Sequence, residues 1–162
     1  MTMNKRRSDH APGGGLGAHS LDSKGYEDQA LKELRAAGFR ITMPRVQVIR
    51  ALADTTTALS AYAIHEKIIN SGGKIDVVSV YRILSTLQEV GLIHHIGVVD
   101  GYFPCRLTGG QSKRTQVVVC EENQNVVELE LPSDVIESLE AQAKENGFTP
   151  TSIKVEITSS TC

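Results

Sequence analysis

Residues 77–96 read VVSVYRILSTLQEVGLIHHI, a helical pattern that passes directly into a strand-like pattern. Apolar residues recur every three or four positions as far as Val90, which predicts a helix with one buried face. Gly91 provides the usual helix end, and the apolar run 92–96 predicts a short strand. The opposite face of the predicted helix is polar and consists of Ser79, Tyr81, Arg82, Ser85 and Thr86.

This polar face has the chemistry of a helix that contacts DNA bases. An arginine can donate to guanine or to phosphate, and short hydroxyl side chains allow close approach to the major groove. The alternative is an ordinary solvated face, but such faces are usually rich in Glu and Lys, and only Glu89 lies here. The predicted DNA contacts on this helix are Ser79, Tyr81, Arg82 and Ser85.

The segments on either side complete a recognisable arrangement. Helical patterns precede this stretch at residues 26–37, 42–54 and 60–71, and Asp100-Gly101 forms a hairpin signal before a second strand at 102–107. Short helices followed by a two-stranded ribbon are typical of a winged helix-turn-helix, in which the ribbon is the wing.

Two further basic residues are candidates for phosphate contacts. Arg45 lies at the start of the second predicted helix, where its guanidinium meets either a phosphate or a surface carboxylate. Lys74 lies in the turn before the recognition helix and is predicted to contact phosphate.

The rest of the chain predicts a second, smaller α/β module, so the fold class is α+β. A module of about 50 residues buries little surface alone, which favours dimerisation through it. Its predicted elements are strands at 117–119 and 126–131, a helix at 135–143 and a strand at 153–157. The predicted divisions are a disordered tail at 1–25, a winged-helix domain at 26–107, a hinge at 108–113 and a dimerisation domain at 114–162.

Charge and composition agree with a DNA-binding module joined to a different one. Residues 1–107 hold 13 Lys and Arg against 10 Asp and Glu, whereas residues 108–162 hold four against nine. No apolar run is long enough for a membrane span, and no apolar signal core follows the basic N-terminus, so we expect a cytoplasmic protein. Three cysteines are too few for a disulfide framework. Without a nucleophile elbow, phosphate loop or HExxH motif, an enzyme is not expected.

Three quoted segments resemble the ferric uptake regulator family: GFRITMPRVQVIRAL at 38–52, LSAYAIHEKI at 59–68 and the opening stretch at 77–96. The most specific patterns are SVYRxLxxLxxxGL at 79–92 and RxTxxR at 40–45. The resemblance implies a dimeric, metal-responsive repressor that binds palindromic, AT-rich operators on double-stranded DNA. It also implies that Tyr81 and Arg82 read DNA and that Arg45 is the family's early arginine.

Several ligand positions of that family are changed here. The segment before Cys120 lacks the family's histidines, and Cys120 and Cys162 each retain one thiolate of a former Cys-x-x-Cys pair. A four-thiolate zinc site is therefore not expected. The family's early sensing histidine is replaced by Ala58 or Thr57. Arg106 replaces an acidic residue, and its charge is expected to repel a cation.

His94 and Cys105 match two ligands of zinc-sensing members, and imidazole and thiolate both suit zinc. Two ligands do not make a site. The candidates for further ligands are His95, Cys120, Glu121 and Glu122. The alternative is that Cys105 is a small buried apolar residue and His94 an ordinary strand residue.

Three functions remain open from the sequence. The leading prediction is a dimeric regulator, a repressor by type, whose metal sensing is reduced or absent and which a thiol redox change at Cys105 or Cys120 can tune. The first alternative is a zinc-responsive regulator with a rearranged site that uses His94 and Cys105. Zinc is the one cofactor that these residues suggest. The second is an interaction module that kept the fold and lost regulation.

Overall fold

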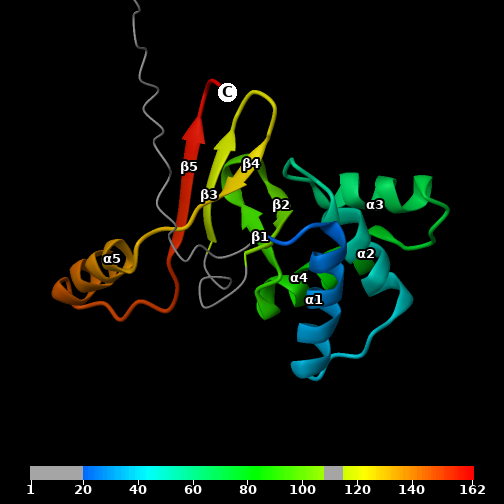
Figure 1. Cartoon of the computed structure of the whole chain (residues 1–162), viewed down its shortest axis with the longest axis horizontal. Helices are drawn as coiled ribbons and strands as arrows, with labels where there is room; N and C mark the ends of the chain where they lie inside the picture. Colours follow the sequence, from blue (N-terminus) through cyan, green and yellow to red (C-terminus); the bar gives the residue numbers. More distant parts are fainter. Residues whose placement is uncertain (1–19, 108–114) are drawn as a thin grey trace, which may run out of the picture.

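The computed structural model describes residues 20–107 and 115–162, which fold into a helical N-terminal part and a C-terminal part built on a small sheet (Figure 1). The predicted tail at 1–25 and the predicted hinge at 108–113 lie largely outside these residues. The predicted α+β class is confirmed. The N-terminal helices are α1 (Ser23–Ala36), α2 (Met43–Ala53), α3 (Ala61–Asn70) and α4 (Val77–Val90).

Local capping explains where these helices begin and end. The Asp22 carboxylate accepts a hydrogen bond from the Gly25 N–H at the start of α1, and the Ser60 hydroxyl accepts one from the Ala63 N–H at the start of α3. Pro44 lies in the first turn of α2, where its missing N–H costs nothing. Gly91 ends α4 with φ of 83°, a left-handed conformation that suits glycine.

The apolar stripe of α4 forms the centre of the N-terminal core. Val80, Leu84 and Leu87 are completely buried against the other three helices. The buried Tyr26 hydroxyl donates to the Leu92 carbonyl at 2.9 Å and thereby ties α1 to the segment that follows α4. The predicted helical stripe therefore packs as expected for an amphipathic helix.

The wing follows directly and consists of β1 (Ile93–Ile96) and β2 (Gly101–Pro104), paired antiparallel with Ile93 opposite Pro104. Between the strands lies a short 3₁₀ turn, η1 (Gly97–Val99), and then Asp100 in a left-handed conformation with φ of 45°. The predicted turn at Asp100-Gly101 is thus present, but it is longer than a two-residue hairpin.

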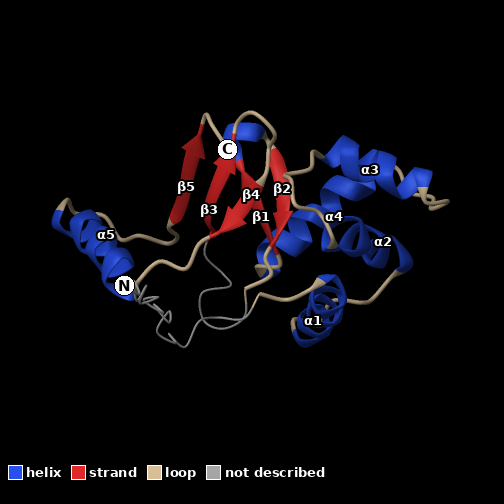
Figure 2. Cartoon of the chain, turned by 45° about the horizontal axis from the view of Figure 1, so that its top comes forward, coloured by secondary structure: helices blue, strands red, loops and turns tan. Residues whose placement is uncertain are grey.

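The C-terminal part is a three-stranded sheet with one crossover helix. Strand β3 lies in the centre, antiparallel to β4 and parallel to β5. Helix α5 makes the connection that a parallel pair requires, and it stands apart from the other helices in Figures 1 and 2. These elements are β3 (Thr115–Cys120), β4 (Val126–Glu128), α5 (Ser133–Glu145) and β5 (Lys154–Ser159).

The wing packs directly against this sheet (Figure 2). A second apolar core joins the two parts of the chain, and it is separate from the core around α4. Its buried members come from the loop before α3, from both wing strands and from β3 and β4. They are Ala58, Ile96, Phe103, Val117, Val119 and Val126.

Backbone hydrogen bonds reinforce this contact between the two parts. The Ala58 N–H donates to the Gln124 carbonyl, and the Val126 N–H donates to the Thr56 carbonyl, both at 3.0 Å. Gly101 permits the close approach, because a Cβ at this position would lie 2.8 Å from the Cβ of Ala58. None of the helices within residues 20–107 and 115–162 has the length and apolar content needed to cross a membrane.

Candidate functional site

The outer face of α4 presents the side chains that the sequence predicted for DNA. Tyr81, Arg82 and Ser85 are all exposed, on the side opposite the buried Val80 and Leu84. Exposure on a helix that follows a short turn after α3 is the geometry that a recognition helix needs to enter the major groove. Their contact with DNA stays a prediction.

Tyr62 extends this face from the first turns of α3, and sequence reasoning missed it. Its ring is 65% exposed and meets the Tyr81 ring edge to face, with centroids 6.3 Å apart and planes at 85°. The two exposed rings are in contact, and adjoining exposed apolar groups indicate a binding surface better than a single exposed residue does. The available signal was the outward position of Tyr62 in the helix that precedes α4. We call Tyr62, Tyr81, Arg82 and Ser85 the recognition face.

The other predicted DNA contacts occupy more constrained positions. The Ser79 hydroxyl donates to the exposed Asp76 carboxylate at the start of α4, and this hydrogen bond lowers the pKa of Asp76. Arg45 donates to the Arg40 carbonyl, and its guanidinium lies 5.5 Å from the centre of the Phe39 ring. Lys74 is exposed in the loop between α3 and α4, as expected for a phosphate contact.

Three potential metal ligands converge where the wing meets the C-terminal sheet. His94 lies on β1, Cys105 directly follows β2 and Glu128 ends β4, and one ligand atom from each lies within 4.8 Å of the others. His94 Nε2 is 2.8 Å from Glu128 Oε2. His94 is 3% exposed and Cys105 is 6% exposed. We call these three residues the interdomain cluster. Among the residues that the structure describes, they are the one such group.

Neighbouring groups orient the cluster. His94 Nδ1 lies 3.0 Å from the Thr115 hydroxyl, which holds the ring so that Nε2 faces Glu128 and Cys105. Glu128 Oε1 accepts a hydrogen bond from the Arg106 backbone N–H at 2.7 Å. Such outer partners are characteristic of metal sites, because they fix the ligand orientation before the ion binds.

The chemistry of the donors suits zinc. Imidazole, thiolate and carboxylate are all zinc ligands, and three protein ligands leave a fourth position for water or another group. Burial and then the Glu128 charge raise the pKa of the Cys105 thiol well above its ordinary value. The thiol is therefore protonated at neutral pH when no cation is near, and metal binding must release this proton.

The Arg106 side chain is directed toward the end of α2, although its charge still interacts with Glu128, so the expected repulsion of a cation stays a prediction. Its guanidinium donates to the carbonyls of Ala53 at 2.9 Å and Thr55 at 2.6 Å, at the end of α2, and lies over the Phe103 ring. The side chain thus caps a helix whose last carbonyls carry partial negative charge. The Arg106 backbone N–H donates the hydrogen bond to Glu128, and the guanidinium interacts with this carboxylate through its charge.

The other candidate ligands lie elsewhere. Cys120 is joined to Cys162 in a disulfide at the far end of β3 from Thr115, and it is not part of the interdomain cluster. His95 is paired with Asp100 within the wing at 2.9 Å. Glu121 and Glu122 are exposed in the turn after β3. Glu128 was missed because no local spacing relates it to His94 or Cys105.

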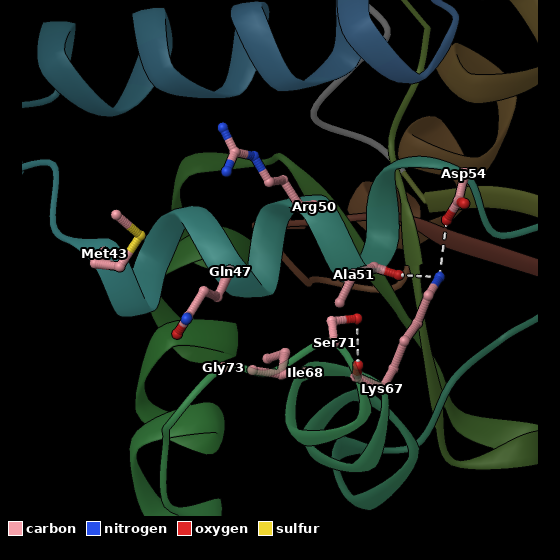
Figure 3. Close-up of a pocket in the computed structure, with 9 residues that line it drawn as sticks. All are labelled: Met43, Gln47, Arg50, Ala51, Asp54, Lys67, Ile68, Ser71 and Gly73. Atoms are coloured by element: carbon pink, nitrogen blue, oxygen red, sulfur yellow. Dashed lines mark hydrogen bonds and ion pairs between the residues drawn. The ribbon is translucent and has the colours of Figure 1, made fainter.

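A surface cavity of about 400 Å³ between α2 and the end of α3 is a separate feature (Figure 3). Its charged groups are already paired, since Lys67 donates to the Ala51 carbonyl and the Asp54 carboxylate, each at 2.8 Å. Arg50 pairs with Glu27 at 2.8 Å. The cavity contains no member of the recognition face or the interdomain cluster, so it is not the candidate site.

The sequence profile described as "Ferric uptake regulator family" matches residues 36–158. This chain belongs to the ferric uptake regulator family. The family consists of metal-responsive, DNA-binding transcriptional regulators, and the resemblance seen in the sequence is thereby confirmed. A relative is the ferric uptake regulation protein of Brucella abortus, 31% identical over 118 residues that cover 72% of this chain and 81% of that one.

Solved structures of the same type share the fold. A zinc uptake regulator complexed with zinc and DNA is 23% identical, with a TM-score of 0.76 over 88% of this chain and 93% of that one. The holo form of XcZur is 26% identical, with a TM-score of 0.71 over 85% of this chain and 94% of that one. The apo form of XcZur is 25% identical and has a TM-score of only 0.51, over 87% of this chain and 95% of that one.

Proposed function

We propose that this protein is a homodimeric, zinc-responsive transcriptional regulator, and by type a repressor, whose metal site is the interdomain cluster. The observation that carries the proposal is the convergence of His94, Cys105 and Glu128 at the contact between wing and C-terminal sheet. The sequence favoured a regulator with reduced or absent metal sensing, because it offered only two ligands. A third, partly buried ligand, Glu128, supports the zinc-responsive alternative.

The cluster lies where an ion affects the arrangement of the two parts of the chain. When bound, zinc would supply the divalent charge that keeps the Cys105 thiol deprotonated and opposes the repulsion between thiolate and carboxylate. His94 and Cys105 come from the wing side and Glu128 comes from β4, so ligation at all three joins wing to sheet. Because the wing follows α4 directly, its position also sets the direction of the recognition face.

The two forms of XcZur support this coupling. Both are the same protein, so their different TM-scores against this chain, 0.71 for the holo form and 0.51 for the apo form, measure conformation. The arrangement of this chain, with the wing packed against the C-terminal sheet, is thus nearer to the holo form. We propose that the cluster without zinc favours a different arrangement, in which the two recognition faces of a dimer no longer match DNA.

The recognition face would bind the major groove of a palindromic, AT-rich operator. Arg82 is the candidate for a guanine edge or a phosphate, and Tyr62 and Tyr81 offer aromatic surface and hydroxyl groups to bases. A dimer would place two α4 helices about one DNA turn apart. Exposed apolar residues on the C-terminal part are candidates for the dimer contact. They are Val127, Val135, Leu139, Phe148 and Ile157.

The proposal is tested by measuring zinc content and DNA affinity together. The purified protein is stripped with a chelator, reloaded with zinc and titrated by fluorescence anisotropy against a duplex that the zinc-loaded protein selects from a random library. We expect one zinc per chain and a zinc-dependent gain in affinity of about five- to 150-fold, the usual range of coupling between two sites.

A matched pair of variants assigns the effect to the cluster. Glu128→Gln keeps the size of the side chain but removes its charge, and it is expected to lose zinc and the zinc-dependent gain. Glu122→Gln makes the same change in an exposed turn and is expected to behave like the unchanged protein. Equal DNA affinity with and without zinc would overturn the zinc response and leave the regulator with reduced metal sensing. Absence of any DNA binding would overturn the regulator itself.

A further inference from the structure

Two cysteines from distant parts of the sequence meet at one end of the C-terminal sheet. Cys120 is the last residue of β3, and Cys162 lies three residues beyond β5. Their Cα atoms are 6.1 Å apart, within the range that disulfides require, and the two sulfur atoms are bonded. Each position carries the thiol that remains from a changed Cys-x-x-Cys pair. The pair is therefore built by the fold, and it is not part of the interdomain cluster.

The two sulfur atoms differ in how easily a small thiol can reach them. Cys120 is 6% exposed, whereas Cys162 is an exposed residue at the chain end. A small thiol or disulfide therefore reaches Cys162 first. Cys120 is then positioned to form the protein disulfide with Cys162. Cys105 offers a contrast, because it is buried and is not part of this disulfide.

Strand β5 connects this pair to the wing. Near the disulfide, the Glu121 N–H donates to the Ser159 carbonyl at 2.9 Å. Near the other end of the strand, the Lys154 ammonium donates to the His95 carbonyl at 2.8 Å, and the Glu156 carboxylate accepts from the Gly97 N–H at 3.1 Å. Strand β5 is six residues long; one end lies near the cysteine pair, and the other end contacts the wing.

The contact between β5 and the wing is partly electrostatic. Partial burial opposes the charge of Glu156, but hydrogen bonds from the Gly97 N–H and the Lys154 ammonium outweigh that effect and lower its pKa. The charged carboxylate therefore holds Gly97 at neutral pH. This contact lasts only while β5 keeps its place beside β3, which the disulfide stabilises from the opposite end.

We propose that Cys120 and Cys162 form a reversible disulfide that holds β5 in place and, through Lys154 and Glu156, holds the wing in the DNA-binding arrangement. This regulation rests on the proposed function. The oxidant class is a low-molecular-weight disulfide, such as glutathione disulfide. The Cys162 thiolate attacks it and releases one glutathione thiol, and Cys120 then displaces the second glutathione from the mixed disulfide. Two protein thiols are oxidised to one disulfide, one glutathione disulfide is reduced to two glutathione thiols, and the two protons of the protein thiols end on these glutathione thiols.

The chemical step is tested by equilibrating the full-length, zinc-loaded protein in glutathione buffers of graded redox ratio, followed by thiol trapping and intact-mass analysis. We expect one two-electron transition, with the bond mapped to Cys120 and Cys162. Cys162→Ser is expected to abolish it, and Ser160→Ala, a matched change two residues away, is expected to retain it. A protein that never gains this bond, or a Cys162→Ser variant that still shows the transition, would overturn the proposal.

The coupling step is tested on the same samples with the selected duplex and by amide hydrogen exchange. Reduction is expected to weaken DNA binding about fivefold or more and to speed exchange at Gly97 and Glu121. Cys162→Ser should match the reduced protein in both redox states. Equal affinity in the two states would overturn this proposal alone. Loss of DNA binding in both states would overturn the proposed function and this regulation with it.

Discussion

The recognition face and the interdomain cluster lie on either side of the same wing connection but are assembled in different ways. Three of the four members of the recognition face come from one turn and a half of α4, so helical periodicity places them together. The cluster takes one ligand from β1, one from the end of β2 and one from β4. The recognition face therefore depends on residues close together in the sequence, whereas the interdomain cluster depends on the packing of distant segments.

Arg106 links the end of α2 to the interdomain cluster, and its replacement has the largest expected effect. Replacing it in Arg106→Met removes the charged hydrogen bonds to the Ala53 and Thr55 carbonyls while keeping an apolar stem over Phe103. We expect a loss of about 1.5–3 kcal/mol in the free energy of unfolding, measured by urea denaturation. Arg35→Met, at the exposed end of α1, should change stability by less than about 0.5 kcal/mol. Equal denaturation midpoints for both variants would show that the link is not structural.

Arg82→Ala separates the recognition face from the cluster. Because Arg82 is exposed and is not a member of the interdomain cluster, its loss should weaken binding to the selected duplex by about 1–3 kcal/mol and leave zinc affinity unchanged. Lys144→Ala removes the same charge from α5 and serves as the control. The assignment of α4 as the recognition helix would be wrong if both variants bound DNA like the unchanged protein.

Thr115→Val tests the opposite side of the comparison. The substitution keeps the shape of a β-branched strand residue but removes the oxygen that orients His94 Nδ1. Loss of such an outer partner should lower zinc affinity about ten- to 100-fold, measured by competition with a chromophoric chelator, with DNA affinity restored at saturating zinc. Thr158→Val, exposed on β5, should keep zinc affinity. An unchanged zinc affinity in Thr115→Val would mean that Thr115 does not orient a zinc ligand.

Tyr62 has the smallest expected effect and refines the recognition face. Tyr62→Ala removes the edge-to-face contact with Tyr81 and should weaken DNA binding by about 0.5–1.5 kcal/mol. Tyr62→Phe keeps the ring, so affinity near that of the unchanged protein indicates support of Tyr81, and affinity near that of Tyr62→Ala indicates a hydroxyl contact with DNA. Tyr62→Ala binding with full affinity would exclude Tyr62 from this face.

The accuracy of the sequence predictions follows the range of the interactions involved. The amphipathic stripe of α4, the Ser60 cap and the glycine end at Gly91 are short-range features, and each is found as predicted. The exposed positions of Tyr81 and Arg82 follow from the same stripe. Tyr62 was missed because it belongs to a neighbouring helix, and its contact with Tyr81 depends on the angle between α3 and α4.

Arg106 illustrates a second kind of difference. In the sequence, Arg106 stands where the family has an acidic ligand, and its positive charge suggested that it repels a cation. In the fold, its guanidinium donates hydrogen bonds at the end of α2, while its backbone N–H donates to Glu128 and its charge acts on that carboxylate. Sequence specifies the charge of a residue but not the direction of a long, flexible side chain, which depends on the carbonyls and rings that packing brings within reach.

The local patterns of residues 38–52, 59–68 and 77–96 were thus sufficient to predict the fold of the N-terminal part and the family. The tertiary structure alone brought Glu128 to His94 and Cys105, and Cys162 to Cys120. The physical reason is the distance along the chain over which each contact acts. Helical stripes and caps depend on neighbours within a few residues, but these two groups form only when β3 and β4 pack on the wing and β5 pairs with β3.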